Sequence, residues 1–79
     1  MNRADIFVQV MTETTGRPKH VVIDYFNQFR KAVPGGEWDQ ELSPERAENL
    51  IQGLRSERDG IFSMLVKGLI EMNRLKGHA

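Results

Sequence analysis

His20 and Asp24 are a histidine and an aspartate four positions apart, a spacing that can support acid–base chemistry. Residues at this spacing share one face of a helix, so their side chains can meet. A catalytic site also needs a nucleophile, a second carboxylate in a different environment or a metal, and the sequence offers no such group at a matching position. The pair is therefore interpreted as an exposed ion pair at the start of a helix, and we expect a non-enzymatic protein.

Acidic residues gather after the glycine pair Gly35-Gly36, at Glu37, Asp39, Glu41 and Glu45. They lack the glycine and the ligand spacing of a calcium-binding loop. The chain has no cysteine, which excludes thiolate zinc sites, and its two histidines, His20 and His78, are far apart. The glycine pair is too short for a phosphate-binding loop. We therefore expect neither a metal nor a cofactor.

The formal net charge is zero, with 11 basic and 11 acidic residues. The charges are unevenly spread, because residues 16–33 carry four basic residues against one acid and residues 37–59 carry seven acids against three arginines. A neutral chain has no overall attraction to nucleic acid or to an acidic membrane. No apolar run reaches the ~20 residues of a membrane span, and the start lacks a signal-peptide pattern. We expect a soluble cytoplasmic protein, which agrees with the absence of cysteine.

Helical periodicity predicts an all-α fold, a small bundle of three or four helices in a single domain over residues 1–79, with a frayed tail at 77–79. Asn2 can cap the first helix, and Gly16 suits the left-handed residue after its end. Ser43 followed by Pro44 is typical of a helix start. The expected helices span residues 3–15, 18–33, 44–57 and 60–76.

The segment of residues 55–60 leaves two alternatives open. Ser56 and Asp59 resemble a capping box and Gly60 is a poor helix former, which favours a break. A register that steps by four and three from Ala47 to Leu75 nevertheless meets apolar or small residues at every position except Arg58, which favours one continuous helix over residues 44–76. Such a helix would be ~50 Å long, too long for a compact domain of this size unless a second copy completes it.

The stretch from Gly60 to Lys76 is the most apolar part of the chain, and we expect the other helices to be built around it. A core of 79 residues is near the lower limit for independent folding, so a homodimer is the expected source of additional buried area. The seam of that dimer is assigned to four apolar residues in the expected continuous register, Leu54, Ile61, Leu65 and Met72.

Trp38 is the only tryptophan, and it lies in the linker between the second and third expected helices. Tryptophan is frequent among interface hot spots, so Trp38 is a candidate partner anchor. The favoured interpretation is that it folds back and closes the end of the bundle, because a core this small depends on its large aromatic side chains.

The first 33 residues resemble the opening of the HU-type bacterial DNA-binding proteins in MNRADI and in TTGRPKHVVIDYFNQFRKAV. That resemblance implies two helices joined by a Thr-Gly turn and a DNA-binding function. The family binds DNA with basic β-strand arms, whereas residues 34–79 are predicted to be helical here, so no binding residue is carried over from the resemblance.

If the chain binds nucleic acid through helix 18–33, the candidate phosphate contacts are the basic residues in and before that helix, Arg17, Lys19, His20, Arg30 and Lys31.

Two functions are therefore compared. The favoured one is a small protein–protein interaction or regulatory module that works through a helical surface and associates with itself. The alternative is a helix-turn-helix-type nucleic-acid-binding protein that uses the basic helix 18–33. Clustered positive charge drives binding to phosphates, and a neutral chain with five basic groups near one helix makes nucleic acid the less favoured partner.

Overall fold

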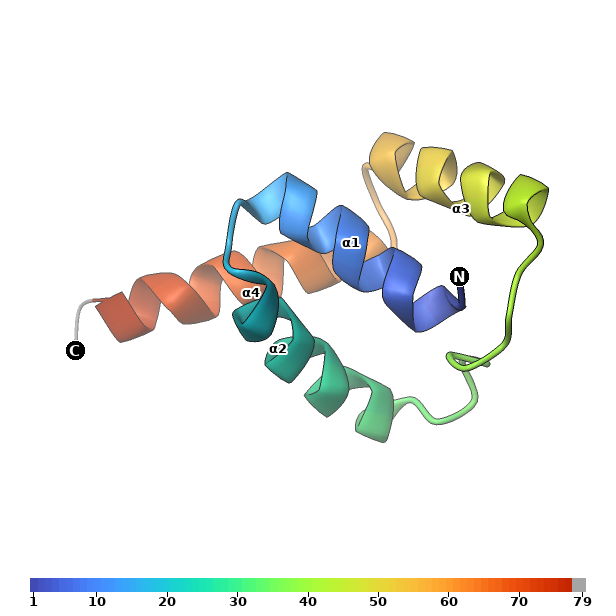
Figure 1. Ribbon diagram of the computed structural model, residues 1–79. Coiled ribbons are helices and arrows are strands. Elements are labelled where there is room, and N and C mark those ends of the chain that lie inside the picture. Colours follow the sequence, from blue (N-terminus) through green and yellow to red (C-terminus); the bar gives the residue numbers. More distant parts are fainter. Residues whose placement is uncertain (78–79) are drawn as a thin grey trace.

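The computed structural model describes residues 1–77, and the side chains up to Met72. It contains four helices, α1 (Arg3–Thr15), α2 (Lys19–Ala32), α3 (Pro44–Ser56) and α4 (Ile61–Gly77) (Figure 1). Within the described residues the only strand-like pairing is an isolated bridge between Asn2 and Glu41. The expected all-α bundle is confirmed. Gly77 ends α4, and positions 78–79 of the expected tail lie outside the described residues.

The helix ends follow the local signals in the sequence. The Asn2 side chain accepts a hydrogen bond of 2.8 Å from the backbone N–H of Asp5, and Gly16 ends α1 in the left-handed region at φ 67°. The Ser43 hydroxyl oxygen accepts a longer bond, 3.3 Å, from the N–H of Arg46 at the start of α3. α2 begins at Lys19, one residue later than predicted, because the backbone of Pro18 has a non-helical ψ of 143°.

The chain breaks between α3 and α4, so the alternative of one continuous helix is wrong. The residue that caps α4 is Glu57, and the predicted capping pair of Ser56 and Asp59 is not used. The Glu57 carboxylate accepts a bond of 2.9 Å from the N–H of Ser63, and the Ser63 hydroxyl donates to the Glu57 carbonyl at 3.2 Å. Gly60 permits the reversal at φ 151°, a backbone conformation that other residues rarely adopt.

The central helix is α1, and the prediction that residues 60–76 occupy the centre is wrong. α1 packs against α2, α3 and α4, and it lies between them in Figure 1. Its apolar residues are buried around most of its circumference, at Ala4, Ile6, Phe7, Val8, Val10 and Met11. The described side chains of α4, up to Met72, are buried on one side only, and Ile61 and Met64 are exposed, at 60% and 72%. Total apolarity therefore did not identify the covered helix, because α4 lies at the edge of the bundle.

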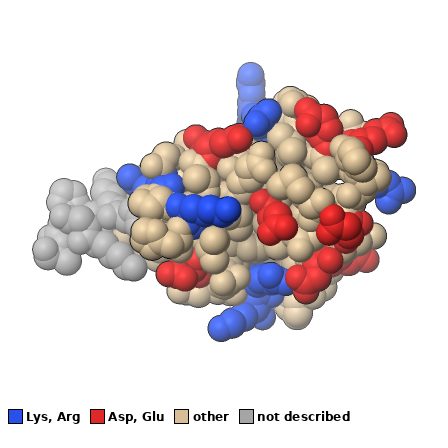
Figure 2. Space-filling view, viewed as in Figure 1, with Lys and Arg blue, Asp and Glu red and all other residues tan. Residues whose placement is uncertain are grey.

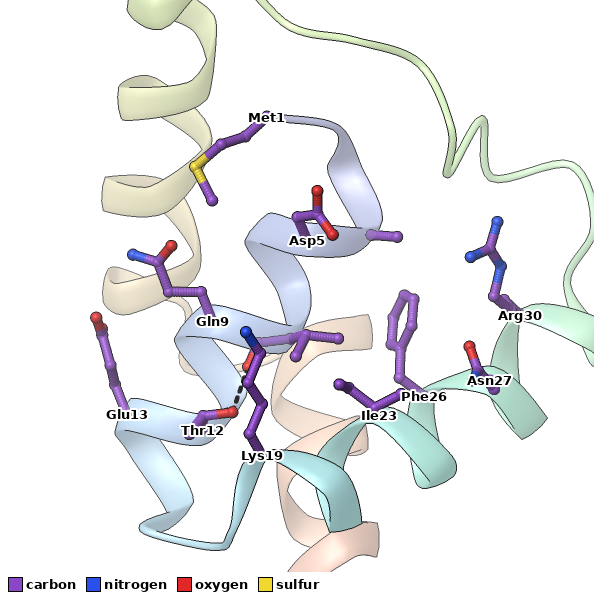
Figure 3. Close-up of a pocket in the computed structure, with 12 residues that line it drawn as sticks. Met1, Asp5, Gln9, Thr12, Glu13, Lys19, Ile23, Phe26, Asn27 and Arg30 are labelled. Carbon is purple, nitrogen blue, oxygen red and sulfur yellow. Dashed lines mark hydrogen bonds between the residues drawn. The ribbon is translucent and has the colours of Figure 1, made fainter.

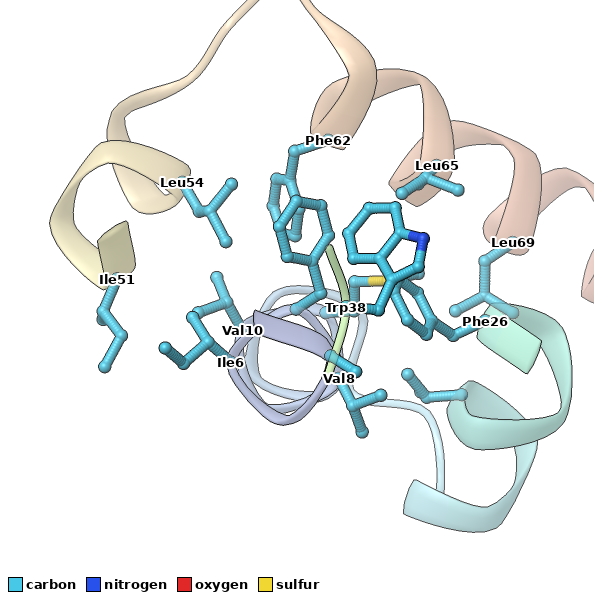
Figure 4. Packing of buried hydrophobic residues seen from close by; sticks show 14 of the residues in the cluster. Ile6, Val8, Val10, Phe26, Trp38, Ile51, Leu54, Phe62, Leu65 and Leu69 are labelled. Atoms are coloured by element: carbon cyan, nitrogen blue, oxygen red, sulfur yellow. The ribbon is translucent and has the colours of Figure 1, made fainter. Parts of the chain in front are cut away.

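Trp38 lies in the core, 7% exposed, as the favoured interpretation of this residue predicted (Figure 4). Its indole makes edge-on contacts with Phe7 and Phe26, with ring centroids 5.2 Å apart in both pairs. Phe62 of α4 reaches the same cluster through an edge-on contact with Phe7 at 5.9 Å. The aromatic residues thus join α1, α2, α4 and the linker into one core.

α2 and α4 approach closely where Tyr25 faces Gly68. A Cβ atom added to Gly68 would collide with the Tyr25 hydroxyl, so the absence of a side chain makes room for the phenol. Burial raises the pKa of Tyr25 above its ordinary value of 10.0, because the charged phenolate would lose its hydration there.

Candidate functional site

A groove with a volume of about 620 Å³ lies between α1 and α2. The two helices form a hairpin that is closed at residues 16–18 and opens toward Met1 and Arg30 (Figures 1 and 3). α4 lies behind this hairpin in both views, so the groove opens on the face away from α4. We call it the α1/α2 groove.

The floor of the α1/α2 groove is apolar and its rims are polar. Ala4 and Val8 of α1 and Phe26 of α2 line the floor, and all three are buried in the core, with Phe26 only 1% exposed. Ile23 is only partly buried and adds an accessible aliphatic side chain. The rims are lined by residues one or two turns apart on each helix, namely Asp5, Gln9 and Glu13 on α1 and Lys19, Asn27 and Arg30 on α2.

The charges of the two rims have opposite signs. On the α1 side Glu13 holds Arg55 of α3 through bonds of 2.9–3.3 Å, while Asp5 has no ion pair within the described residues. On the α2 side Arg30 pairs with Asp39 of the linker at 2.8 Å, while Lys19 is exposed and has no ion pair in the described part of the chain. Two charges, one on each rim, are therefore free to meet a ligand.

The linker fixes the open end of the groove. The backbone N–H of Ala4, one of the donors left over at a helix start, donates a bond of 3.0 Å to the Trp38 carbonyl. The N–H of Leu42 donates to the Met1 carbonyl, also at 3.0 Å. These bonds tie the beginning of α1 to the linker, so the distance between the rims is set by the folded core.

The four residues of the predicted dimer seam do not share one surface. Leu54 and Leu65 are buried in the core, which leaves them unavailable to a second copy in this fold. Met72 is partly buried against the core, and Ile61 is exposed. The break at Glu57 destroys the continuous register on which that seam depended. Among the side chains of α4 that the structure describes, the exposed large apolar ones are Ile61, Met64 and Ile70.

The five predicted phosphate contacts fall into two separate groups. Lys19 and His20 begin α2 and Arg17 lies two residues before it, whereas Arg30 and Lys31 lie in its last turn. About three helical turns, or ~15 Å, separate the groups. The ion pair with Asp39 also neutralises part of the charge of Arg30. Acidic side chains gather over α3 and the linker on the right of Figure 2, and no broad basic face is seen in that view.

His20 and Asp24 are both exposed on α2, and no ion pair joins them in the described part of the chain. No group of three or more His, Cys, Asp or Glu residues within the described side chains is arranged to hold a metal ion. None of the described helices combines the length and apolarity needed to cross a membrane.

Comparison with family models, with curated proteins and with solved structures found no match for this chain. The resemblance to the opening of the HU-type proteins therefore has no support beyond the residues quoted for it. The described residues 34–77 contain two helices and no β-strand arm.

Sequence reasoning missed the α1/α2 groove, although one signal for it was present. Val8 and Ile23 are apolar residues beside the main stripes of their helices, and both line the groove. An apolar residue off the main stripe indicates a second covered side. Which side that is depends on the angle between the helices, and residue spacing does not give that angle.

Proposed function

We propose that this chain is a small non-enzymatic protein–protein interaction module of the cytoplasm, and that the α1/α2 groove receives its partner. The observation that carries the proposal is the geometry of the groove. It has an apolar floor, polar rims and an entrance on a face that neither α3 nor the described part of α4 covers. Helix-binding domains commonly hold an amphipathic segment in a hydrophobic groove of this kind.

Two features support the rigidity that such a site needs. The floor residues Val8 and Phe26 belong to the core, so the groove cannot collapse without disturbing the fold. The linker bond between Ala4 and Trp38 holds the start of α1 in place. A preformed site saves the ordering cost that a flexible surface would incur on binding.

We propose self-association through α4 as a second use of the helical surface. Ile61 and Met64 are three residues apart, lie on one side of α4 and are both more than half exposed. A second copy is the commonest partner for such a surface. Leu54 and Leu65, which belong to the predicted dimer seam, are buried in the core and take no part in this contact.

The nucleic-acid alternative receives less support. Its basic groups are divided between the two ends of α2, and Arg30 is already paired with Asp39. Affinity for phosphate depends on the number of cations that meet the backbone together. A divided set of this size supports at most weak, salt-sensitive binding.

The proposal is tested by quantitative capture from a lysate of the source cells. Asn27→Trp places a bulky ring in the groove, whereas Gln28→Trp places the same ring on the neighbouring exposed position of α2, which does not line the groove. We expect a defined partner to be retained by the wild type and by Gln28→Trp and to be lost with Asn27→Trp. Equal capture by all three proteins would overturn the assignment of the groove.

A further inference from the structure

The opposite charges of the two rims define the chemistry of the occupant. We infer that the α1/α2 groove binds one amphipathic helix of a different protein, with its basic flank along α1 and its acidic flank along α2. This inference rests on the proposed function and specifies its partner. The free carboxylate of Asp5 lies at the open end of the groove, and the free ammonium of Lys19 lies at the closed end.

The length of the groove fits a helix of about three turns. The lining residues on the α1 side extend from Met1, just before the helix, to Glu13, which corresponds to ~18 Å along a helix axis and to a segment of ~12 residues. Asp5 and Lys19 stand on opposite rims and at opposite ends. A matching ligand therefore carries its basic and acidic contact residues about two turns apart and on opposite flanks of one apolar stripe.

The helices of a second copy do not match this description. α1 and α2 form the groove themselves, and α3 buries its apolar residues Ala47, Ile51 and Leu54. The described side chains of α4, up to Met72, expose Ile61 and Met64, but the side next to them is buried through Leu65 and Leu69, so this part of α4 has one accessible flank. An occupant with two charged flanks must therefore come from another protein.

A helix display library tests the inference on the intact chain. The library presents helices of ~14 residues with a varied apolar stripe and with Glu, Lys or Gln at every flank position. Selections are run on the wild type, on Lys19→Glu and on Lys31→Glu, and Asn27→Trp serves to identify binders that use the groove. Lys31 is an exposed lysine of the same helix that does not line the groove, so its reversal is the matched control.

The expected result is a charge exchange. Groove-dependent peptides selected on the wild type should carry acid on one flank and base on the other, and Lys19→Glu should weaken them about three- to tenfold at low salt. The same variant should select lysine in place of the acid that meets position 19, whereas Lys31→Glu should change neither result. Added salt should reduce the difference, because these charges are exposed.

Other outcomes overturn the inference in distinguishable ways. Groove-dependent binders without charged flanks would overturn the polarity and leave the proposed function standing. A library that yields no groove-dependent binder would overturn both. A wild-type dimer that dissociates with Asn27→Trp, but not with Gln28→Trp, would make a second copy the occupant.

Discussion

The indole Nε1 of Trp38 donates a hydrogen bond of 2.9 Å to the backbone carbonyl of Val33, the residue that directly follows α2. This bond closes the linker on itself over five residues and directs the ring into the core. The guanidinium of Arg3 covers the outer side, with its central carbon 5.6 Å from the centre of the indole. Because the Trp38 carbonyl also accepts from Ala4, this one residue joins the end of α2 to the start of α1.

Replacement of Trp38 should therefore strongly reduce stability. Trp38→Phe keeps an aromatic ring but leaves the Val33 carbonyl without its donor, and we expect a loss of about 1–3 kcal/mol in the free energy of unfolding. Trp38→Ala also removes the ring contacts and should cost about 3–5 kcal/mol. Urea unfolding followed by circular dichroism measures both. A loss below about 0.5 kcal/mol for Trp38→Ala would contradict the placement of the indole in the core.

The contact between Tyr25 and Gly68 predicts a non-additive pair of substitutions. Gly68→Ala improves helix propensity by about 1 kcal/mol, but its methyl group collides with the Tyr25 hydroxyl, so we expect a net loss of about 1 kcal/mol or more in the wild type. In Tyr25→Phe the nearest ring carbon lies 3.6 Å from the new methyl group, an ordinary contact. Gly68→Ala should then stabilise the protein. Equal effects in the two backgrounds would show that the helices do not meet at this point.

Stability should fall at high pH because of the same phenol. The pKa of Tyr25 is raised by burial, so the unfolded chain releases this proton at a lower pH than the folded chain does. The corresponding stability is fully present below pH 10.0 and is lost as the pH rises through the folded value. Unfolding measured at about pH 9 and about pH 11 should show a larger loss for the wild type than for Tyr25→Phe. An identical loss in the two proteins would contradict the burial of Tyr25.

The exposed side of α4 predicts a concentration-dependent dimer. Sedimentation equilibrium over a roughly hundredfold concentration range should show two copies associating, and Met64→Glu should return the protein to the mass of one chain. Met64 is 72% exposed, so this substitution leaves the core intact, whereas a charge at the buried Leu65 would unfold the chain. Gln52→Glu on the exposed side of α3 is the control. A wild type that keeps the mass of one chain throughout would end this proposal.

Local chemistry made the four helices predictable. Asn2, Gly16 and Ser43 act at helix ends through bonds to residues at most four positions away, and the sequence displays such neighbours directly. The cap of α4 was not predictable in the same way, because Glu57 reaches Ser63 across six positions and depends on the path of the turn.

The central helix and the candidate site depend on contacts between distant segments. α4 is the more apolar of the two helices in sequence, and only the packed fold makes α1 the covered helix and leaves Met64 in solvent. The α1/α2 groove arises from the angle between two helices, and the ion pair of Glu13 with Arg55 joins positions 42 apart. Side-chain periodicity contains neither relationship.

The most direct test of the groove as a binding site is site-specific photo-crosslinking in the source cells. A photoreactive phenylalanine is placed at Asn27, which lines the groove, at the adjacent exposed Gln28, or at Gln52 on α3. Adjacent residues point about 100° apart around a helix axis, so the first two probes lie at nearly the same height along α2 but face different surfaces. We predict a defined adduct from position 27, with the crosslinked peptide in an amphipathic helix of the partner, and none from positions 28 and 52. Adducts from position 28 or 52 with none from position 27 would contradict the assignment of the α1/α2 groove.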